Sequence, residues 1–204
     1  MKAIIILANI KKINKDILKD SYIIGCDRGA YIAAINDIVM DVAIGDFDSV
    51  NDFEFKLIKK FSKNVTKLNP IKDLTDTKEA INLCANFDSI LILGGIKGHR
   101  IEHFYANLIE LCNDKRISMM DEDSLIETHD YSFKPNNNYK YVSFFSISNE
   151  SIISLEGFSY KLDNYILKNN DPLCISNEIL NNPYVDIKMG RILTIYSKND
   201  HELN

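Results

Sequence analysis

The first part of the chain alternates short apolar runs with amphipathic stretches, and this alternation most limits the folds open to it. Ile, Leu and Val dominate the runs at residues 3–8, 22–26, 42–44, 65–68 and 89–93. We expect helices at residues 51–61, 76–86 and 101–112, and the last two show apolar residues at the spacing of a one-sided helix. Strands that are apolar almost throughout are typical of sheets covered on both faces. The pattern therefore predicts an α/β fold with a doubly wound, mostly parallel sheet.

The sequence pattern changes after residue 121. From there the runs are short, rich in β-branched and aromatic residues, and separated by Asn, Gly and Asp. We expect strands at residues 125–128, 139–146, 152–155, 158–162, 173–176, 185–189 and 192–196, with a loop at residues 134–138. The acidic turn Asp121-Glu122-Asp123 is the expected boundary. The chain therefore divides into an α/β domain, residues 1–123, and an all-β domain, residues 124–204.

Charge and cysteine usage indicate which kinds of binding partner and which cellular compartment to expect. The 24 Lys and Arg residues face 29 Asp and Glu residues, for a formal net charge of -5, and no basic block indicates nucleic-acid binding. Cys26, Cys84, Cys112 and Cys174 form no C-x-x-C pair, which favours buried thiols in a reducing cytoplasm. The apolar run at residues 3–8 is too short to span a membrane. We expect a cytoplasmic protein without membrane or nucleic-acid partners.

An acidic loop stands where the apolar run at residues 42–44 ends. Its sequence is Gly45-Asp46-Phe47-Asp48-Ser49. Paired carboxylates at the carboxyl end of a strand can hold a divalent cation, and Gly45 allows backbone or phosphate to approach closely. An alternative is an acidic turn in which Asp48 or Ser49 caps the helix beginning near Asn51.

Polar clusters also follow other predicted strands. Asp27-Arg28-Gly29 fits either a ligand contact or a helix start capped by Asp27. In Lys72-Asp73-Leu74-Thr75-Asp76, Asp76 with Glu79 fits a capping box, while a cation beside carboxylates and a hydroxyl suits a metal-bound phosphate. A glycine-rich segment, residues 94–107, offers backbone donors and Arg100 as a bidentate phosphate ligand. Neither standard nucleotide-binding glycine motif occurs.

Residues His99 to His103 also match H-x-x-E-H, the pattern of an inverted zinc protease. That chemistry requires both histidines on one regular helix. The glycine-rich run before His99 places it in a loop or at a helix end, and no third zinc ligand stands out.

Taken together and in order, these clusters resemble the thiamine pyrophosphokinase family. The resemblance rests on Asp27-Arg28-Gly29, residues 41–49, Lys72-Asp73-Leu74-Thr75-Asp76 with Glu79-Ala80, residues 94–107, residues 157–162 and residues 174–178. It covers nearly the whole chain. It implies a C-terminal β-sandwich that binds thiamine and mediates a homodimer. It also implies the reaction, in which thiamine and ATP give thiamine diphosphate and AMP with magnesium as cofactor.

The resemblance also implies roles for individual residues. Asp46, Asp48 and Asp76 would hold magnesium, and with Asp73 and Arg100 they form the expected catalytic set. Asp73 is the candidate base for the thiamine hydroxyl. The nucleotide would contact Asp27, Arg28, Gly45, Lys72, Thr75, Gly95, Arg100, His103 and Asn107. Ser176 and Asn177 would bind thiamine, although a Ser-Asn pair also fits a turn that ends a strand.

The chain departs from the family pattern at two positions and leaves two other functions open. His99 stands where the family usually has Gly, and Glu102 where it usually has Asp. The chain has no Trp, so aromatic stacking on thiamine would come from Tyr or Phe. The alternatives are a non-catalytic module that binds thiamine or a nucleotide, and a magnesium-dependent phosphotransferase acting on another alcohol.

Overall fold

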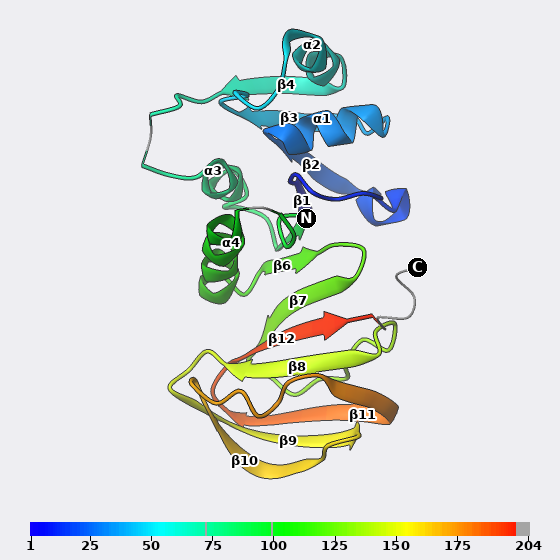
Figure 1. Ribbon diagram of the computed structural model, residues 1–204, viewed down its shortest axis with the longest axis vertical. Coiled ribbons are helices and arrows are strands. Elements are labelled where there is room, and N and C mark those ends of the chain that lie inside the picture. The colour runs from blue at the N-terminus through cyan, green and yellow to red at the C-terminus, as the bar shows by residue number, and fades with distance from the viewer. Residues whose placement is uncertain (72, 99, 199–204) are drawn as a thin grey trace. The chain divides into compact units, whose positions relative to one another are not determined.

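The computed structural model describes residues 1–71, 73–98 and 100–198. The chain divides into two units, Met1–Glu122 and Asp123–Asn204, so the division falls inside the acidic turn, one residue before the expected boundary (Figure 1).

A parallel sheet forms the centre of the first unit, with its strands in the order β6-β5-β1-β2-β3-β4. The strands are β1 (Lys2–Ile6), β2 (Ser21–Cys26), β3 (Met40–Gly45), β4 (Ser62–Lys67), β5 (Ser89–Leu93) and β6 (Ile117–Met120). The order of the strands reverses at β1, whose neighbours are β2 and β5. In open α/β sheets, ligands bind beyond the carboxyl ends of the strands at such a reversal.

Helices connect these strands, namely η1 (Lys15–Leu18), α1 (Arg28–Ile35), α2 (Asp52–Lys60), α3 (Asp76–Asn82) and α4 (Ile101–Asn113). Helix α1 packs on β1, β2 and β3 and against α2, over a core that includes Ile4, Ile6 and Met40. Helix α3 contacts the same three strands. A capping box between Asn51 and Glu54 begins α2, so the expected helix at residues 51–61 matches the observed one with its caps.

Antiparallel strands make up the second unit. They are β7 (Ser124–His129), β8 (Tyr141–Ser146), β9 (Glu150–Phe158), β10 (Leu162–Lys168), β11 (Asn177–Met189) and β12 (Ile192–Ser197). Strand β12 pairs with β7 and β8, and the start of β11 extends this sheet. The rest of β11 pairs with β9, which also pairs with β10. Because β11 takes part in both sheets, the unit is a sandwich, with Phe144 and Phe158 in contact at 5.7 Å between ring centres.

These observations confirm the predicted class, a parallel α/β unit followed by an all-β sandwich; the doubly wound detail stays a prediction. Some predicted elements were wrong. Residues 173–176 form a turn, because Ser176 has a φ of 52° and the apolar Leu173 and Ile175 are exposed. Phe158 ends β9 and Leu162 begins β10, so residues 158–162 are not one strand. Helix α3 ends at Asn82, before the predicted end at residue 86.

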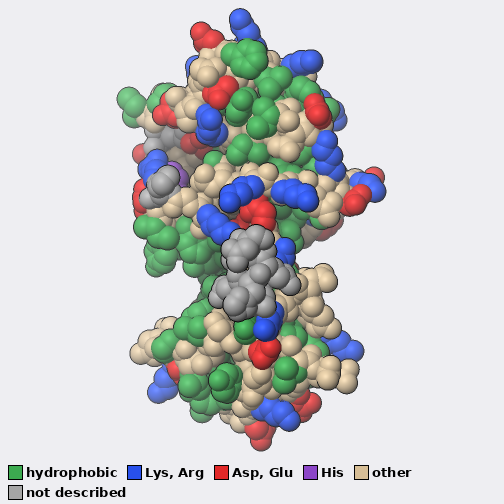
Figure 2. Space-filling model, turned by 45° about the vertical axis from the view of Figure 1, so that its right-hand side comes forward, with side chains coloured by type: hydrophobic (Ala, Val, Ile, Leu, Met, Phe, Trp, Pro, Cys, Tyr) green, Lys and Arg blue, Asp and Glu red, His purple; other side chains and the backbone are tan. Residues whose placement is uncertain are grey.

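The surface of the protein carries charges of both signs. On the face shown in Figure 2, acidic and basic side chains are interspersed with apolar ones. None of the four cysteines is in a disulfide, and Cys26, Cys84 and Cys174 are buried. Within the described residues, no helix combines the length and apolar character needed to cross a membrane.

Candidate functional site

The acidic segment between β3 and α2, residues 45–50, forms a tight loop that we call the carboxylate loop. Phe47 has a φ of 58°, and its buried ring packs on Phe55 of α2 at 5.1 Å between ring centres. This anchor turns the neighbouring side chains outward: Asp46 is half-buried and Asp48 is exposed. The N–H of Asp48 donates to Oδ1 of Asp46 at 3.1 Å. Neither Asp48 nor Ser49 caps α2, because Asn51 takes that role.

Asp27, between β2 and α1, lies directly against this loop. Its Oδ1 accepts the N–H of Phe47 at 3.2 Å. A Cβ atom at Gly45, where φ is 154°, would overlap the Asp27 carboxylate. This overlap explains why a glycine occupies the position. Asp27 was expected to cap α1 in one interpretation, but its φ is 48° and its side chain makes no cap hydrogen bond.

A third carboxylate reaches the same place from α3. Thr75 is the N-cap of α3 and accepts the N–H of Lys78 at 3.1 Å, so the predicted capping box of Asp76 and Glu79 is wrong. The carboxylate of Asp76, the first residue of α3, instead lies close enough to Asp27 to raise the pKa of that carboxyl group. Asp73 is exposed, and Lys72 lies outside the described residues.

Asp27, Asp46 and Asp76 therefore form a cluster of carboxylates, to which Asp48 is adjacent in the loop. Burial, followed by the neighbouring charge of Asp76 and a smaller contribution from Asp46, raises the pKa of Asp27 to about 7. The donors are all oxygen atoms, which magnesium prefers, and a bound cation would relieve their mutual repulsion. The chemistry of these donors therefore suits magnesium, and Asp27, which the sequence suggested as a phosphate contact, lies among them. Within the described residues, the carboxylates whose ligand atoms lie within 4.8 Å of one another are those of Asp121, Glu122 and Asp123.

The glycine-rich segment follows β5 and leads into α4. Gly94 and Gly95 have φ values of 85° and 72°, and the N–H of Gly95 donates to the carbonyl of Ala8 at 3.2 Å. A Cβ atom at Gly95 would press on the side-chain amide of Asn107, which is buried in α4. Asn107 thus lies behind Gly95, whereas Arg100 and His103 are exposed.

The zinc-protease pattern receives little support from this geometry. Nε of Arg100 donates to Oε1 of Glu102 at 2.9 Å, which lowers the pKa of Glu102 below its ordinary value. His99, which that pattern requires as a ligand, lies outside the described residues.

A cavity of about 440 Å³ lies where β1 and β5 end, at the reversal of strand order. It is lined by Asn9, Ile10, Lys11, Lys97, Gly98 and Glu122. The side chain of Glu122 accepts the backbone N–H groups of Lys11 and Lys12, and Nζ of Lys97 lies 3.5 Å from the buried Asp121. Sequence reasoning included Lys97 and Gly98 in the glycine-rich segment but missed Asn9, Ile10 and Lys11, which match no motif. The position of the strand-order reversal is the signal that could have found them.

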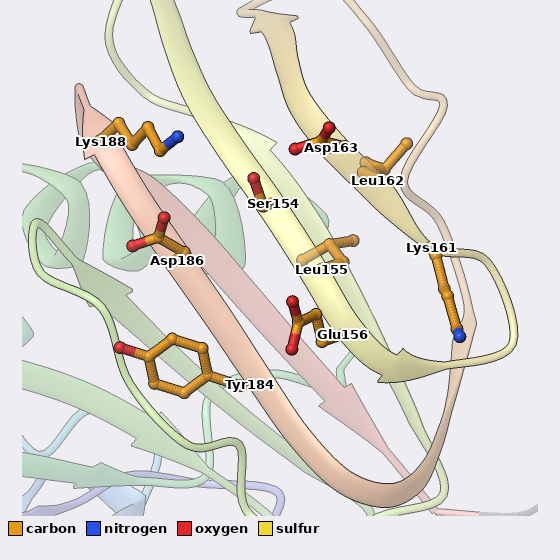
Figure 3. Close-up of a pocket in the computed structure, with 9 residues that line it drawn as sticks. All are labelled: Ser154, Leu155, Glu156, Lys161, Leu162, Asp163, Tyr184, Asp186 and Lys188. Atoms are coloured by element: carbon orange, nitrogen blue, oxygen red, sulfur yellow. The ribbon is translucent and has the colours of Figure 1, made fainter.

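A larger cavity of about 600 Å³ lies on the outer face of the sheet formed by β9, β10 and β11 in the second unit. Figure 3 shows Tyr184, Asp186 and Lys188 of β11 across from Ser154 and Glu156 of β9, with Asp163 on β10. None of the predicted site residues lines this cavity.

The predicted thiamine-binding pair has two different environments. Ser176 is exposed and its N–H donates to Oγ of Ser143 at 2.9 Å. Asn177 is buried, and its side-chain amide bonds both ways with the main chain of Tyr160: Oδ1 accepts the N–H at 2.9 Å and Nδ2 donates to the carbonyl at 2.7 Å. Asn177 therefore holds the turn at Tyr160, and its amide is already engaged in the absence of substrate.

Comparisons with known proteins match each of the two units to a separate family model. The family model for the catalytic domain of thiamin pyrophosphokinase matches residues 13–120, and the model for its vitamin B1 binding domain matches residues 128–192. The chain belongs to the thiamine pyrophosphokinase family. The catalytic-domain match contains the carboxylate cluster and the glycine-rich segment, and the second match contains Ser176 and Asn177. Family membership decides against the zinc-protease alternative.

Individual relatives support the same assignment. A thiamine pyrophosphokinase of Bacillus subtilis (strain 168) is 30% identical over 166 residues, which cover 77% of this chain and 78% of that protein. The crystal structure of thiamine pyrophosphokinase from Bacillus subtilis is similar with a TM-score of 0.84 and 27% identity, covering 97% of this chain and 99% of that one. A thiamin pyrophosphokinase family protein from Enterococcus faecalis has a TM-score of 0.83 at 23% identity and covers 98% and 99%, which shows the shared fold.

Proposed function

We propose that the protein transfers the diphosphoryl group of ATP to the hydroxyl of thiamine, giving thiamine diphosphate and AMP. The observation that carries this proposal is the match of both family models, in order, to a chain with a carboxylate cluster at the carboxyl ends of β2 and β3. Diphosphoryl transfer depends mainly on positioning and on neutralising a polyanion, and this cluster is suited to both through a bound cation.

Magnesium is the proposed cofactor, held by Asp46, Asp48 and Asp76 together with Asp27. When bound, it would neutralise the phosphate oxygens and orient them for in-line attack. The protein residues fix the site: the buried ring of Phe47 and the Asp27 hydrogen bond set the direction of Asp46. Asp73, which is exposed near the start of α3, is the proposed acceptor of the hydroxyl proton.

The nucleotide is proposed to lie between the carboxylate cluster and the cavity at the ends of β1 and β5. Lys11 and Lys97 line that cavity and supply positive charge, and Gly98 of the glycine-rich segment also lines it. Arg100, Lys72, Thr75, His103 and Gly95 keep their predicted roles around the phosphates. Asn107 acts from behind Gly95, because it is buried.

Thiamine is proposed to bind through the second unit, at Ser176 and the turn that Asn177 holds. The same unit is the proposed site of homodimer formation, since it exposes the apolar Leu173, Ile175 and Leu180 at 60%, 51% and 50%. The proposed location is the cytoplasm, in keeping with the absence of disulfides among the four cysteines.

Identification of the products tests the proposal. The purified protein is incubated with thiamine, ATP and magnesium, and products are separated by chromatography and assigned by phosphorus NMR. The expected result is thiamine diphosphate and AMP in equal amounts, with no AMP when thiamine is omitted. Formation of ADP and thiamine monophosphate would contradict diphosphoryl transfer. Binding of both ligands without any product would favour the non-catalytic module.

A further inference from the structure

Arg28 is the first residue of α1, and its guanidinium group points to the end of the carboxylate loop. Nη1 donates to the carbonyl oxygen of Ser49 at 2.9 Å. Nη1 and Nη2 also lie 3.4 and 3.3 Å from the two carboxylate oxygens of Glu54. The forked edge that Arg would use for bidentate phosphate binding is therefore already occupied by protein acceptors.

Glu54 connects this contact to the start of α2. Its side chain is only 12% exposed, and Oε2 also accepts the N–H of Asn51 at 2.9 Å. Moving Arg28 to a phosphate would leave this nearly buried carboxylate without its cation, which is costly. The arrangement therefore opposes a direct role of Arg28 in nucleotide binding.

The carboxylate loop has one anchor at each end, supplied by adjacent residues. Asp27 binds the N–H of Phe47, and Arg28 binds the carbonyl of Ser49. Between them lie Asp46 and Asp48. Since Phe47 has a φ of 58°, a conformation that non-glycine residues rarely adopt, external anchors are needed to keep the loop in one shape.

We infer that Arg28 is a positioning residue, which fixes the carboxylate loop through Ser49 and Glu54 and so orders Asp48 and Asp46 for cation binding. This inference rests on the proposed function, because it takes the loop to be the magnesium site. It replaces the expected contact between Arg28 and the nucleotide phosphates. Its effect on the reaction is indirect, through the shape of the loop.

Hydrogen exchange of the metal-free protein tests the loop directly. Arg28→Ala should speed exchange of the amides of residues 47–50 by about tenfold, since one end of the loop loses its anchor. Glu54→Gln should speed this exchange to a smaller extent, because glutamine replaces one of the two acceptor oxygens with an NH2 group that faces a donor of Arg28. Lys56→Ala, which removes an exposed cation of α2 outside these contacts, is the matched control and should exchange like the wild type.

Titration calorimetry with magnesium and steady-state kinetics complete the test. Arg28→Ala and Arg28→Lys should both weaken magnesium binding and lower kcat, by about tenfold or more for Ala, with the KM for ATP at saturating magnesium within about twofold of wild type. Lysine keeps the charge but cannot bind Ser49 and Glu54 together. Because it conserves a phosphate-binding charge, Arg28→Lys separates the two roles even where Arg28→Ala folds poorly.

The opposite pattern in Arg28→Ala would overturn the inference. In that pattern the amides of residues 47–50 exchange as in the wild type, while the KM for ATP rises about tenfold or more, which marks a phosphate contact. Failure of the proposed function is distinguishable. If Asp46→Asn binds magnesium as the wild type does, the metal site is wrong. The exchange result in the metal-free protein stands independently of that outcome.

Discussion

Asp27 combines two roles that a single residue rarely fills. It accepts the Phe47 N–H that shapes the carboxylate loop, and its carboxyl group lies beside the charge of Asp76 in the cluster that a cation would occupy. Its ionisation is therefore opposed in the metal-free protein. Two consequences follow, one for stability against pH and one for cation binding.

The raised pKa of Asp27 predicts the direction of the pH effect on stability. In the folded, metal-free protein the carboxyl group holds its proton up to about pH 7, whereas its ordinary pKa is 3.8. Between pH 3.8 and about pH 7 the folded state binds a proton that the unfolded state has lost. The contribution of Asp27 to the free energy of unfolding is therefore fully present below pH 3.8 and is lost as the pH rises to about 7.

Urea denaturation in the presence of a chelator, across that pH range, measures this effect. Asp27→Asn should remove the corresponding fall in stability, while Asp52→Asn, which alters an exposed aspartate at the start of α2, should keep it. Equal pH dependence in both variants and the wild type would show that Asp27 is ionised throughout. Magnesium binding should release a proton from the wild type below about pH 7.

Asn177 differs from its neighbour Ser176 in burial, and this difference predicts different mutational effects. Asn177→Ala leaves the main-chain N–H and carbonyl of Tyr160 without partners, so it should lower the free energy of unfolding by about 1 to 3 kcal/mol. It should also weaken thiamine binding while leaving the affinity for magnesium-ATP nearly unchanged. Ser176→Ala, at an exposed position, should cost less than about 0.5 kcal/mol.

Chemical denaturation and calorimetric titration of each ligand check both variants. Equal weakening of thiamine and ATP binding in Asn177→Ala would indicate a general loss of structure. A stability equal to that of the wild type would show that the Tyr160 contacts are dispensable.

At the scale of elements, the strands of the first unit were the most predictable part of the fold. Runs such as residues 89–93 are buried on both faces of a parallel sheet, so their apolar character was continuous and the predicted range matches β5. Residues 173–176 were predicted as a buried strand because Leu173 and Ile175 are apolar, but both side chains are exposed. Composition gave no sign of that exposure.

Hydrogen-bond partners were much less predictable than elements. The sequence placed Asp27, Asp46 and Asp76 after neighbouring elements, but not the contact between Asp27 and Asp76. It also suggested caps at Asp27, Asp48 and Asp76, whereas α2 and α3 are capped by Asn51 and Thr75. Several polar residues at each helix start satisfy the same capping preference, so tertiary contacts decide among them.

The loop after β1 supplies a test of the nucleotide site. Lys11 lines the cavity at the ends of β1 and β5, whereas its neighbour Lys12 does not. Lys11→Ala should therefore raise the KM for ATP about threefold to tenfold, the usual range for one exposed phosphate-binding charge, with the KM for thiamine unchanged. Lys12→Ala is the control and should behave as the wild type in steady-state kinetics. Equal effects of the two variants would indicate general electrostatic attraction.

For the whole molecule, the proposal of a homodimer predicts its mass in solution. Light scattering should give twice the mass of the 204-residue chain. Leu180→Asp, which places a charge among the exposed apolar side chains of the second unit, should shift the protein toward monomer. Phe53→Asp alters an equally prominent apolar side chain, 73% exposed in the first unit, and should leave the mass unchanged. A wild type that is fully active as a monomer would contradict the proposed homodimer.

If the carboxylate cluster holds the magnesium on which diphosphoryl transfer depends, Asp46→Asn should lose magnesium-dependent AMP formation. Asp46 is half-buried beside Asp27, while Asp52 is an exposed aspartate at the start of α2 and serves as the matched control. Asp46→Asn should lower kcat by about a thousandfold or more and abolish magnesium binding, with the melting temperature little changed. Asp52→Asn should retain wild-type turnover. AMP formation at the wild-type rate by Asp46→Asn would show that magnesium does not act through this cluster.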